Sequence, residues 1–351
     1  MIYKPKKLLR VSQHCIDEHD KKAVMDVMDS GTIARGARVR EFEDKICEVT
    51  GAKYAVACSS GTAALHLAMM TEKSEAGPYV EISAITFIAS VNAALQAGAR
   101  EIHPLEGGYI DVVEADVYIP MHYAGHSMIP SHVTISNAVE DACHAFGGHY
   151  EGTQTKVGSV NTTCFSFHPT KNITTGEGGA VTTNDVDIAC RLDNLRDNGR
   201  EHGAVLYPGL NYHMSEMNAA LGISQLSKLN QFLEVKRSLC EVYWNNLPDQ
   251  VKPVLKPWNV RYDAPSIFPV EIDFENLPHT KEEVQEVLLA QNIETSVHYM
   301  PIHLHPVLGG QRGDLPEAEA YWDRTLTLPL HVGLDDVDVR YICDKLGEAL
   351  K

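Results

Sequence analysis

The chain has 351 residues, with 30 Lys and Arg against 47 Asp and Glu, which gives a formal net charge of −17. This acidic balance argues against a partner such as nucleic acid or an anionic membrane, because both are bound by clustered Lys and Arg. No apolar run reaches the roughly 18–20 residues of a membrane span, and the opening residues, MIYKPKKLLRVSQHC, lack the apolar core of a signal peptide.

The Cys and His content points to a reduced protein without a metal. None of the eight Cys forms a CxxC pair, and the 17 His include no HExxH helix motif. A chain of this length can bury a core without disulfides. We therefore expect free thiols in a cytoplasmic protein, no contact with membrane or nucleic acid, and no bound metal.

In chain order, the first half of the sequence alternates short apolar strands with helices. The expected strands are 54–58, 80–84, 101–105, 117–122, 137–141, 161–167 and 179–183, and the expected helices are 39–49, 63–70 and 87–96. Such alternation predicts an α/β domain with a largely parallel sheet. The 11 residues between Leu105 and Val117 are few for a helical crossover. Either that crossover has little or no helix, or one neighbouring pair of strands is not parallel.

The second half has a different pattern. Apolar residues at helical spacing predict one long helix over 221–247, and a Pro-punctuated stretch follows. Beyond it we expect a strand at 266–272, a helix at 281–291, a strand at 295–299 and a C-terminal helix from Asp335. The predicted domains are a large α/β unit (15–225) and a smaller α+β unit (226–351), with residues 1–14 packed against the smaller one.

Three short segments of the predicted large domain carry candidate chemistry. Ser60-Gly61-Thr62 lies at a strand-to-helix turn, where free N–H groups attract phosphate, although an ordinary capped helix explains it equally well. Asp141 ends an apolar strand, where ligands bind in open α/β sheets, although a solvated turn acid is the simpler reading. Lys171 lies between a strand and a Gly-rich turn, a position that suits a Schiff-base lysine, although a surface lysine fits too.

Taken together, the three segments favour one cofactor. Pyridoxal phosphate (PLP) needs a lysine for its aldehyde, an anion beside its pyridinium nitrogen and a cup for its phosphate. Lys171, Asp141 and the Ser60-Gly61-Thr62 turn supply all three. The combination predicts a PLP enzyme.

The chain resembles the DegT-type sugar aminotransferases, which are fold-type I PLP enzymes, along nearly its whole length. The matching stretches are GAKYAVACSSGTAALHLA, AITFIASVNAALQAGA, VEDACHAFGGHY, CFSFHPTKNITTGEGGAVTTND, LNYHMSEMNAALGISQL, VHYMPIHLHP and LTLPLHVGL. The resemblance implies a large, mostly parallel-sheet domain and a smaller C-terminal domain. The segments 99–117 and 125–137 are shorter here than is usual in that family, which implies trimmed crossovers.

The resemblance also implies roles for individual residues. Lys171 would form the internal aldimine and shuttle protons, and Asp141 would pair with the pyridinium nitrogen. The other implied cofactor contacts are Gly61, Thr62 and Ser166 at the phosphate, Phe87 on the ring face, His144 near the phenolic oxygen, and Asn211 from a neighbouring subunit. His298, Tyr299 and His303 would line the sugar–nucleotide site, unless they are ordinary packing residues. The role of Asn211 requires a homodimer with shared active sites.

The implied reaction is a ping-pong transfer of an amino group from glutamate to a nucleotide-linked keto sugar. The segments SFHPTKNITTGEGG, VHYMPIH and LPLHVGL most resemble enzymes that aminate C4 of a UDP-linked 4-keto-6-deoxy amino sugar. A 3-keto sugar or a keto-cyclitol remains an alternative acceptor. A vestigial PLP-binding protein without turnover is an alternative of another class. A nucleotide-binding oxidoreductase is not supported, because the chain lacks a GxGxxG motif after a strand.

Overall fold

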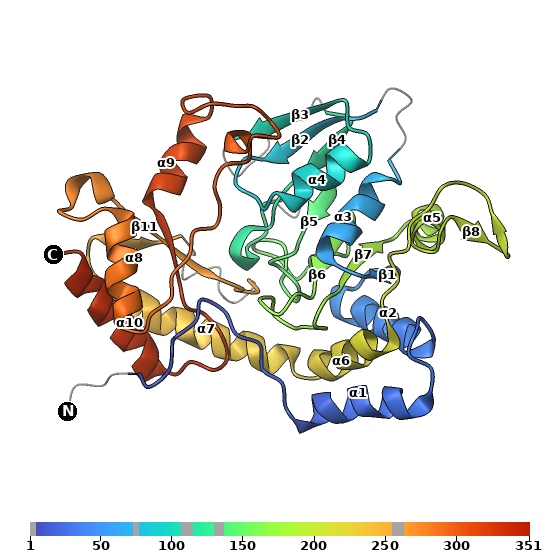
Figure 1. Cartoon of the computed structure of the whole chain (residues 1–351), viewed down its shortest axis with the longest axis horizontal. Helices are drawn as coiled ribbons and strands as arrows, with labels where there is room; N and C mark the ends of the chain where they lie inside the picture. Colours follow the sequence, from blue (N-terminus) through green and yellow to red (C-terminus); the bar gives the residue numbers. More distant parts are fainter. Residues whose placement is uncertain (1–4, 73–76, 107–114, 130–136, 255–262) are drawn as a thin grey trace.

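The computed structural model describes residues 5–72, 77–106, 115–129, 137–254 and 263–351. A larger part with a central sheet and a smaller C-terminal part lie side by side, and helix α7 (Leu229–Asn246) runs along both (Figure 1). The sequence-based division at residue 225 stays a prediction. None of the helices in the described ranges is long and apolar enough to cross a membrane.

The central sheet is mostly parallel, as the sequence predicts. Its strands are β1 (Tyr54–Cys58), β2 (Tyr79–Ser83), β3 (Glu101–Leu105), β4 (Val117–Ile119), β5 (Val139–Asp141), β6 (Thr162–Ser166) and β7 (Gly179–Thr183). Two ladders, β3-β2-β4 and β5-β6-β7-β1, meet where parallel bridges join Tyr118 to Ala138 and Met121 to Asp141. Strand β7 is antiparallel to both of its neighbours, and the other ladder pairs are parallel.

The connections of the sheet depart from a regular parallel fold in two places. Between the parallel strands β5 and β6, residues 142–161 form turns and no helix. The antiparallel strand β7 follows β6 through a tight loop and needs no crossover. The segment between Leu105 and Val117 lies largely outside the described residues.

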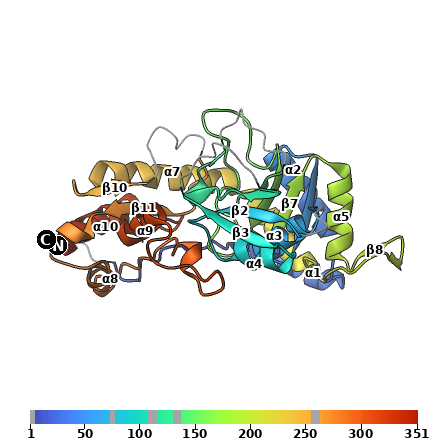
Figure 2. The ribbon, with the colours of Figure 1, turned by 90° about the horizontal axis from the view of Figure 1, so that it is seen from above.

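Helices cover both faces of this sheet. They are α1 (Glu18–Ser30), α2 (Ala37–Thr50), α3 (Gly61–Met69), α4 (Ala89–Gln96), α5 (Val186–Arg196) and α6 (Glu216–Leu226). Successive residues of β1 point to opposite faces, so Val56 and Cys58 pack in the cluster with α3 and α4, whereas Ala57 packs with α2. Seen from above, α3 and α4 lie on the side of the sheet opposite α7 (Figure 2).

The smaller part packs helices on an antiparallel sheet. Its elements are β10 (Val251–Pro253), β11 (Phe268–Ile272), α8 (Lys281–Ala290), α9 (Pro316–Arg324), β12 (Thr325–Leu328) and α10 (Asp336–Ala349), with the sheet order β10-β11-β12. Its core also takes in Leu9, whose backbone bridges to Ile293. The backbone N–H of Leu330 bonds to the carbonyl of Val11 at 3.0 Å. The N-terminal segment therefore lies against this part.

Two predicted elements are wrong. The helix expected over 221–247 is two helices, α6 and α7, because the chain turns at Lys228, whose Nζ lies 2.9 Å from Asp17 and 2.6 Å from Asp20. The strand expected at 295–299 is absent, and within it Ser296 forms an isolated bridge to Thr327. Its apolar pattern reflects side chains that face the site described next.

Candidate active site

The candidate site lies where β5 and β6 end and α3 begins. Asp141 is the last residue of β5, and Ser166 is the last residue of the parallel strand β6. Gly179 pairs with Ser166 on one side and with Cys58 on the other, which brings the turn before Gly61 beside β6. The register of the sheet thus brings two sequence-predicted segments together at one edge, the position where open α/β sheets bind ligands.

The start of α3 is shaped as a cup for an anion. A Cβ on Gly61 would lie 2.7 Å from the Cβ of Ser166, so glycine lets the start of α3 come this close to the end of β6. Ser60 caps the helix through its Oγ, which accepts the N–H of Ala63 at 3.1 Å. In the described chain this cap leaves the first N–H groups, those of Gly61 and Thr62, available to a ligand. Free N–H groups at the positive end of a helix bind phosphate.

Asp141 is a buried acid with acceptor capacity to spare. Its Oδ2 accepts the hydroxyl of Ser90 at 2.7 Å, and its Oδ1 accepts the backbone N–H of Cys143 at 3.2 Å. Two carboxylate oxygens offer about four lone-pair positions, so further donors fit. A protonated ring nitrogen is such a donor, and the PLP pyridinium therefore matches this acid.

Lys171 lies partly buried on the loop between β6 and β7. The loop is held by its own residues, since Lys171 N bonds to His168 O at 2.9 Å and Thr174 Oγ1 bonds to Phe167 O at 3.1 Å. The Thr174 hydroxyl therefore shapes the loop rather than a ligand site. Burial lowers the pKa of Lys171 against the opposing charge of Asp141. A lowered pKa favours the neutral amine, which is the form that attacks a carbonyl.

Four more predicted residues gather into one ring cluster. The ring centroids of Phe87 and Tyr299 are 5.7 Å apart, those of Tyr299 and His144 are 5.9 Å apart, and those of His144 and His298 are 6.3 Å apart. Phe87 is 53% exposed, so its ring is open to a stacking partner. Burial, with the charge of Lys171 in addition, lowers the pKa of His298 to about 4. The cluster therefore lies near the lysine.

The imidazole of His144 is neutral and its tautomer is fixed. Its Nδ1 accepts the backbone N–H of Ala124 at 3.3 Å, so Nε2 carries the proton and donates to the Tyr299 hydroxyl at 2.9 Å. Burial, reinforced by Lys171, lowers the pKa of His144 well below its usual value. Burial, together with the charge of Asp141, raises the pKa of Tyr299. Tyr299 therefore keeps its own hydrogen and can donate it.

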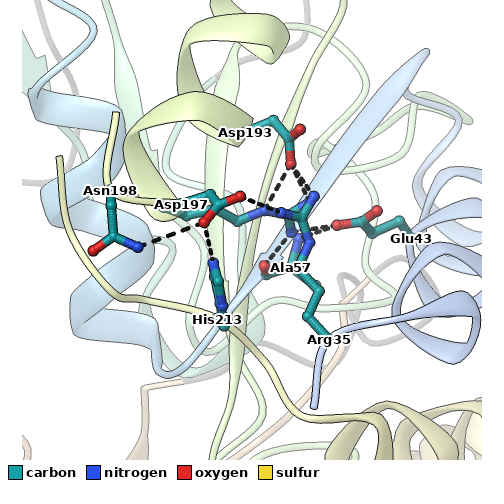
Figure 3. A network of polar contacts seen from close by, with 8 residues as sticks. Arg35, Glu43, Ala57, Asp193, Asp197, Asn198 and His213 are labelled. Atoms are coloured by element: carbon teal, nitrogen blue, oxygen red, sulfur yellow. Dashed lines mark hydrogen bonds and ion pairs between the residues drawn. The ribbon is translucent and has the colours of Figure 1, made fainter. Parts of the chain in front are cut away.

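Asn211 lies elsewhere, exposed on the surface of the chain. Its backbone bridges to Asp197, just beyond the end of α5. Figure 3 shows Asp197 within a polar network, where it lies 3.1 Å from His213 Nε2 and 3.7 Å from Arg35 Nη1. Arg35 also pairs with Asp193. The network holds the segment that carries Asn211, and the next residue, Tyr212, accepts the N–H of Ser59 just before the turn at Gly61.

His303 is not brought into the ring cluster by any contact in the described residues. It is buried, and its Nε2 lies 2.9 Å from Glu319 Oε1, while Glu319 also accepts the N–H of Gly313 at 2.8 Å. These contacts tie the loop before α9 to the helix. The role of His303 at a sugar–nucleotide site stays a prediction.

Sequence reasoning missed Ser90, which holds Asp141. Ser90 lies in α4, 51 positions from its partner, and nothing local distinguishes its hydroxyl from that of any other buried Ser. It also missed Tyr123, whose ring centroid lies 6.2 Å from that of His144. Both contacts are long-range, and a single sequence without the fold gives no signal for them.

Comparison with known proteins shows which enzymes this chain is similar to. The chain is 30% identical to the UDP-4-amino-4,6-dideoxy-N-acetyl-β-L-altrosamine transaminase of Campylobacter jejuni, covering 98% of each chain. It is 30% identical to the GDP-perosamine synthase of Caulobacter vibrioides, covering 95% of this chain and 96% of that one. Its fold matches the solved structure of Helicobacter pylori PseC, an aminotransferase involved in pseudaminic acid biosynthesis, with a TM-score of 0.88 and 27% identity. That match covers 98% of this chain and 99% of the other.

The family assignment extends over almost the whole chain. The profile of the DegT/DnrJ/EryC1/StrS aminotransferase family matches residues 14–347. That range includes the phosphate cup, Asp141 and Lys171, whose arrangement fits PLP. The resemblance and the fold class inferred from the sequence are both confirmed. The chain belongs to the DegT/DnrJ/EryC1/StrS aminotransferase family and is a PLP-dependent sugar aminotransferase.

Proposed function

We propose that the enzyme moves an amino group from glutamate to a nucleotide-linked keto sugar, namely a UDP-linked 4-keto-6-deoxy amino sugar. The observation that carries the proposal is that Lys171, Asp141 and the cup at Gly61 meet at one edge of the sheet. The chain's similarity over nearly its full length to the Campylobacter transaminase supports the choice of acceptor.

Each group at this edge has a task that follows from its surroundings. The N–H groups of Gly61 and Thr62, with the hydroxyl of Ser166, would hold the cofactor phosphate, and the Phe87 ring would cover one face of the pyridine. When bound, PLP supplies an aldehyde that carries the amino group between substrates and a ring that withdraws electrons. Asp141 keeps a proton on the ring nitrogen, because Ser90 fixes its carboxylate and burial makes an unpaired charge costly.

Lys171 is the proton carrier of the reaction. Its lowered pKa favours the neutral amine, which takes the proton from the α-carbon of the donor and returns a proton in the second half of the cycle. Tyr299 can donate its hydrogen toward an oxygen in the site because His144 Nε2–H already occupies the tyrosine oxygen as an acceptor. These residues therefore divide binding, orientation and proton transfer among themselves.

The working enzyme is a homodimer in this proposal. Asn211 is exposed and its segment is held by the bridge to Asp197, so its side chain is open to a ligand on a second copy of the chain. In each active site, Asn211 of the neighbouring copy would then contact the cofactor phosphate.

The proposal is tested by absorption spectroscopy of the protein with PLP, before and after glutamate. We expect a visible band that bleaches when glutamate is added and returns when a UDP-linked 4-keto-6-deoxy amino sugar follows. A panel with GDP-linked 4-keto sugars, 3-keto sugars and keto-cyclitols checks the acceptor, and the similarity to GDP-perosamine synthase makes the GDP sugars its first comparison. Return of the band with one of these, and not with the UDP sugar, would contradict the proposed acceptor. A band that never responds to glutamate would contradict the donor.

A further inference from the structure

A cleft opens beside Lys171, and the proposed roles leave it unexplained. It has about 250 Å³ of empty space, part of it open to solvent. Its walls come from segments far apart in the sequence, including Gln13 of the N-terminal segment, Asn172 of the lysine loop, Lys236 of α7 and Val332 after β12. None of the described residues that line it is an acid. The cleft therefore offers donors next to the reactive lysine.

Lys236 is a buried cation in this cleft. Its side chain is 4% exposed, and its Nζ donates to Asn172 Oδ1 at 2.8 Å. An ammonium carries three N–H groups, and the partner found for Lys236 among the described residues is the neutral amide of Asn172. Burial, with Lys171 in addition, lowers the pKa of Lys236 to about 8. A buried charge without a counter-ion is costly to maintain, so its presence calls for a ligand.

His331 supplies a second donor, next in the chain to Val332 of the cleft wall. The ring is 5% exposed, and its Nδ1 accepts the backbone N–H of Gly333 at 3.1 Å. The neutral ring therefore has its proton on Nε2, and this buried atom has no hydrogen-bond partner within the described structure. Burial, with the charge of Lys236 in addition, lowers the pKa of His331 to about 4. Two buried donors thus lie near each other, and the described residues supply no acceptor for His331 Nε2.

We propose that Lys236 and His331 form a subsite for the carboxylate of the amino donor. The inference rests on the proposed function, because an amino acid that gives its α-proton to Lys171 must hold its carboxylate one bond away from that carbon. An ammonium and an N–H donor together match the two oxygens of a carboxylate. Because the cleft is narrow and only partly open to solvent, a head group rather than a whole ligand would enter it.

The test measures binding rather than turnover. Glutarate, a dicarboxylate without an amino group, is titrated into the PLP-loaded protein by calorimetry, and UDP is titrated separately. We expect Lys236→Met to weaken glutarate binding by at least about tenfold and to leave UDP binding unchanged. Lys252→Met, at an exposed lysine of β10, is the matched control and should bind both ligands as the wild type does.

A second pair of variants keeps the test independent of Lys236. His331→Leu and His331→Gln both lose the acceptor for Gly333, but Gln retains an N–H near the position of Nε2. We expect Leu to weaken glutarate binding several-fold more than Gln does. If Lys236 were merely structural, Lys236→Met would lower the melting temperature and leave glutarate affinity intact, whereas a subsite predicts a melting temperature that holds or rises.

Each contrary outcome has its own reading. Glutarate binding that is absent in the wild type, or equal in the wild type and Lys236→Met, overturns the subsite. Loss of UDP binding in place of glutarate binding overturns the donor assignment and gives the cleft to the nucleotide. The glutamate-dependent bleaching of the wild type is read first. If it occurs and glutarate binding ignores Lys236, the subsite fails while the proposed function stands; if it does not occur, the proposed function itself fails.

Discussion

The two faces of strand β5 carry adjacent buried acids, Glu140 and Asp141, which differ in how far the protein satisfies their hydrogen-bonding capacity. The carboxylate of Glu140 accepts His122 Nε2 at 2.9 Å, the Tyr150 hydroxyl at 2.8 Å and the Asn161 amide at 2.6 Å. The carboxylate of Asp141 accepts the Ser90 hydroxyl and the N–H of Cys143, the Cys143 thiol is also hydrogen-bonded to it, and lone-pair capacity remains. Alternation along a strand sends these neighbours to opposite sides. One face is satisfied by the protein, and the other is left for a ligand.

This difference shows why burial alone does not identify a functional acid. Glu140 is fully buried, and although burial by itself raises its pKa, the charge of His122 and the surrounding donors lower it overall. The hydrogen-bonding capacity of the Glu140 carboxylate is therefore used by other residues of the fold. Asp141 is equally inaccessible, yet its partners leave it incomplete. The count of unused hydrogen-bonding positions, rather than exposure, separates the ligand face from the structural face.

The largest effect should come from removing the lysine that faces Asp141. Lys171→Ala removes the group that accepts and returns the proton, so we expect turnover to fall by at least about 10⁴-fold. The fold should persist, because the loop is held by contacts such as Thr174 to Phe167. Single-turnover kinetics with glutamate, alongside a melting curve, checks both statements. Turnover near the wild-type rate would place the reactive amine elsewhere.

The sharpest use of the comparison is to neutralise each acid in turn. Asp141→Asn should reduce the transamination rate by about 10²–10³-fold, the usual cost of losing one electrostatic contact to developing charge, with little change in stability. Glu140→Gln should lower the free energy of unfolding by about 1–3 kcal/mol, because it weakens the hydrogen bonds that this buried carboxylate accepts, while the folded fraction stays active. Urea titrations and rates on both variants decide between the faces. If Asp141→Asn mainly lowered stability and Glu140→Gln mainly lowered the rate, the ligand face and the structural face would be reversed.

The pH dependence of stability should follow Glu140. Its pKa is lowered in the folded state, so its contribution to stability is present above its unfolded pKa of about 4.3 and is lost as the pH falls through the folded value. The wild type should therefore lose stability on acidification more steeply than Glu140→Gln. Unfolding midpoints in urea between about pH 3 and pH 6 measure the two slopes. Parallel slopes would mean that Glu140 is not charged in the fold.

The smallest effect on the rate should come from changing Ser90, which supports Asp141 through one hydrogen bond. Ser90→Ala removes the hydrogen bond to Asp141 Oδ2 and should cost about 1 kcal/mol, or about fivefold in rate. Ser90→Thr keeps the hydroxyl and serves as the rescue. A rate that Ser90→Ala leaves unchanged would show that Asp141 needs no support from α4.

Sequence reasoning predicted much of the fold because local patterns encode it. Strands β1, β3 and β7 match their expected bounds, since each is a short segment between turn residues. The long helix over 221–247 was wrong because the break depends on Lys228 meeting acids about 210 positions away. The absent strand at 295–299 was misread because its apolar and aromatic residues serve the site cluster.

The candidate site divides in the same way. Lys171, Asp141 and the turn at Gly61 could be identified because each follows a recognisable strand in the order that a PLP site requires. Ser90, Lys236 and His331 could not, because their significance lies in partners, or in missing partners, that the fold alone brings near. His303 is the opposite case, because its sequence motif suggested a role at the sugar–nucleotide site. In the fold its side chain contacts Glu319, and the predicted role stays untested.

The central claim is that Lys171, and not the other buried lysine beside it, holds the cofactor. The direct measurement is to load the protein with PLP, reduce it with borohydride so that the cofactor becomes fixed to its lysine, and map the labelled peptide by mass spectrometry. The account predicts a single labelled site at Lys171. Label on Lys236, or no stable label, would contradict it.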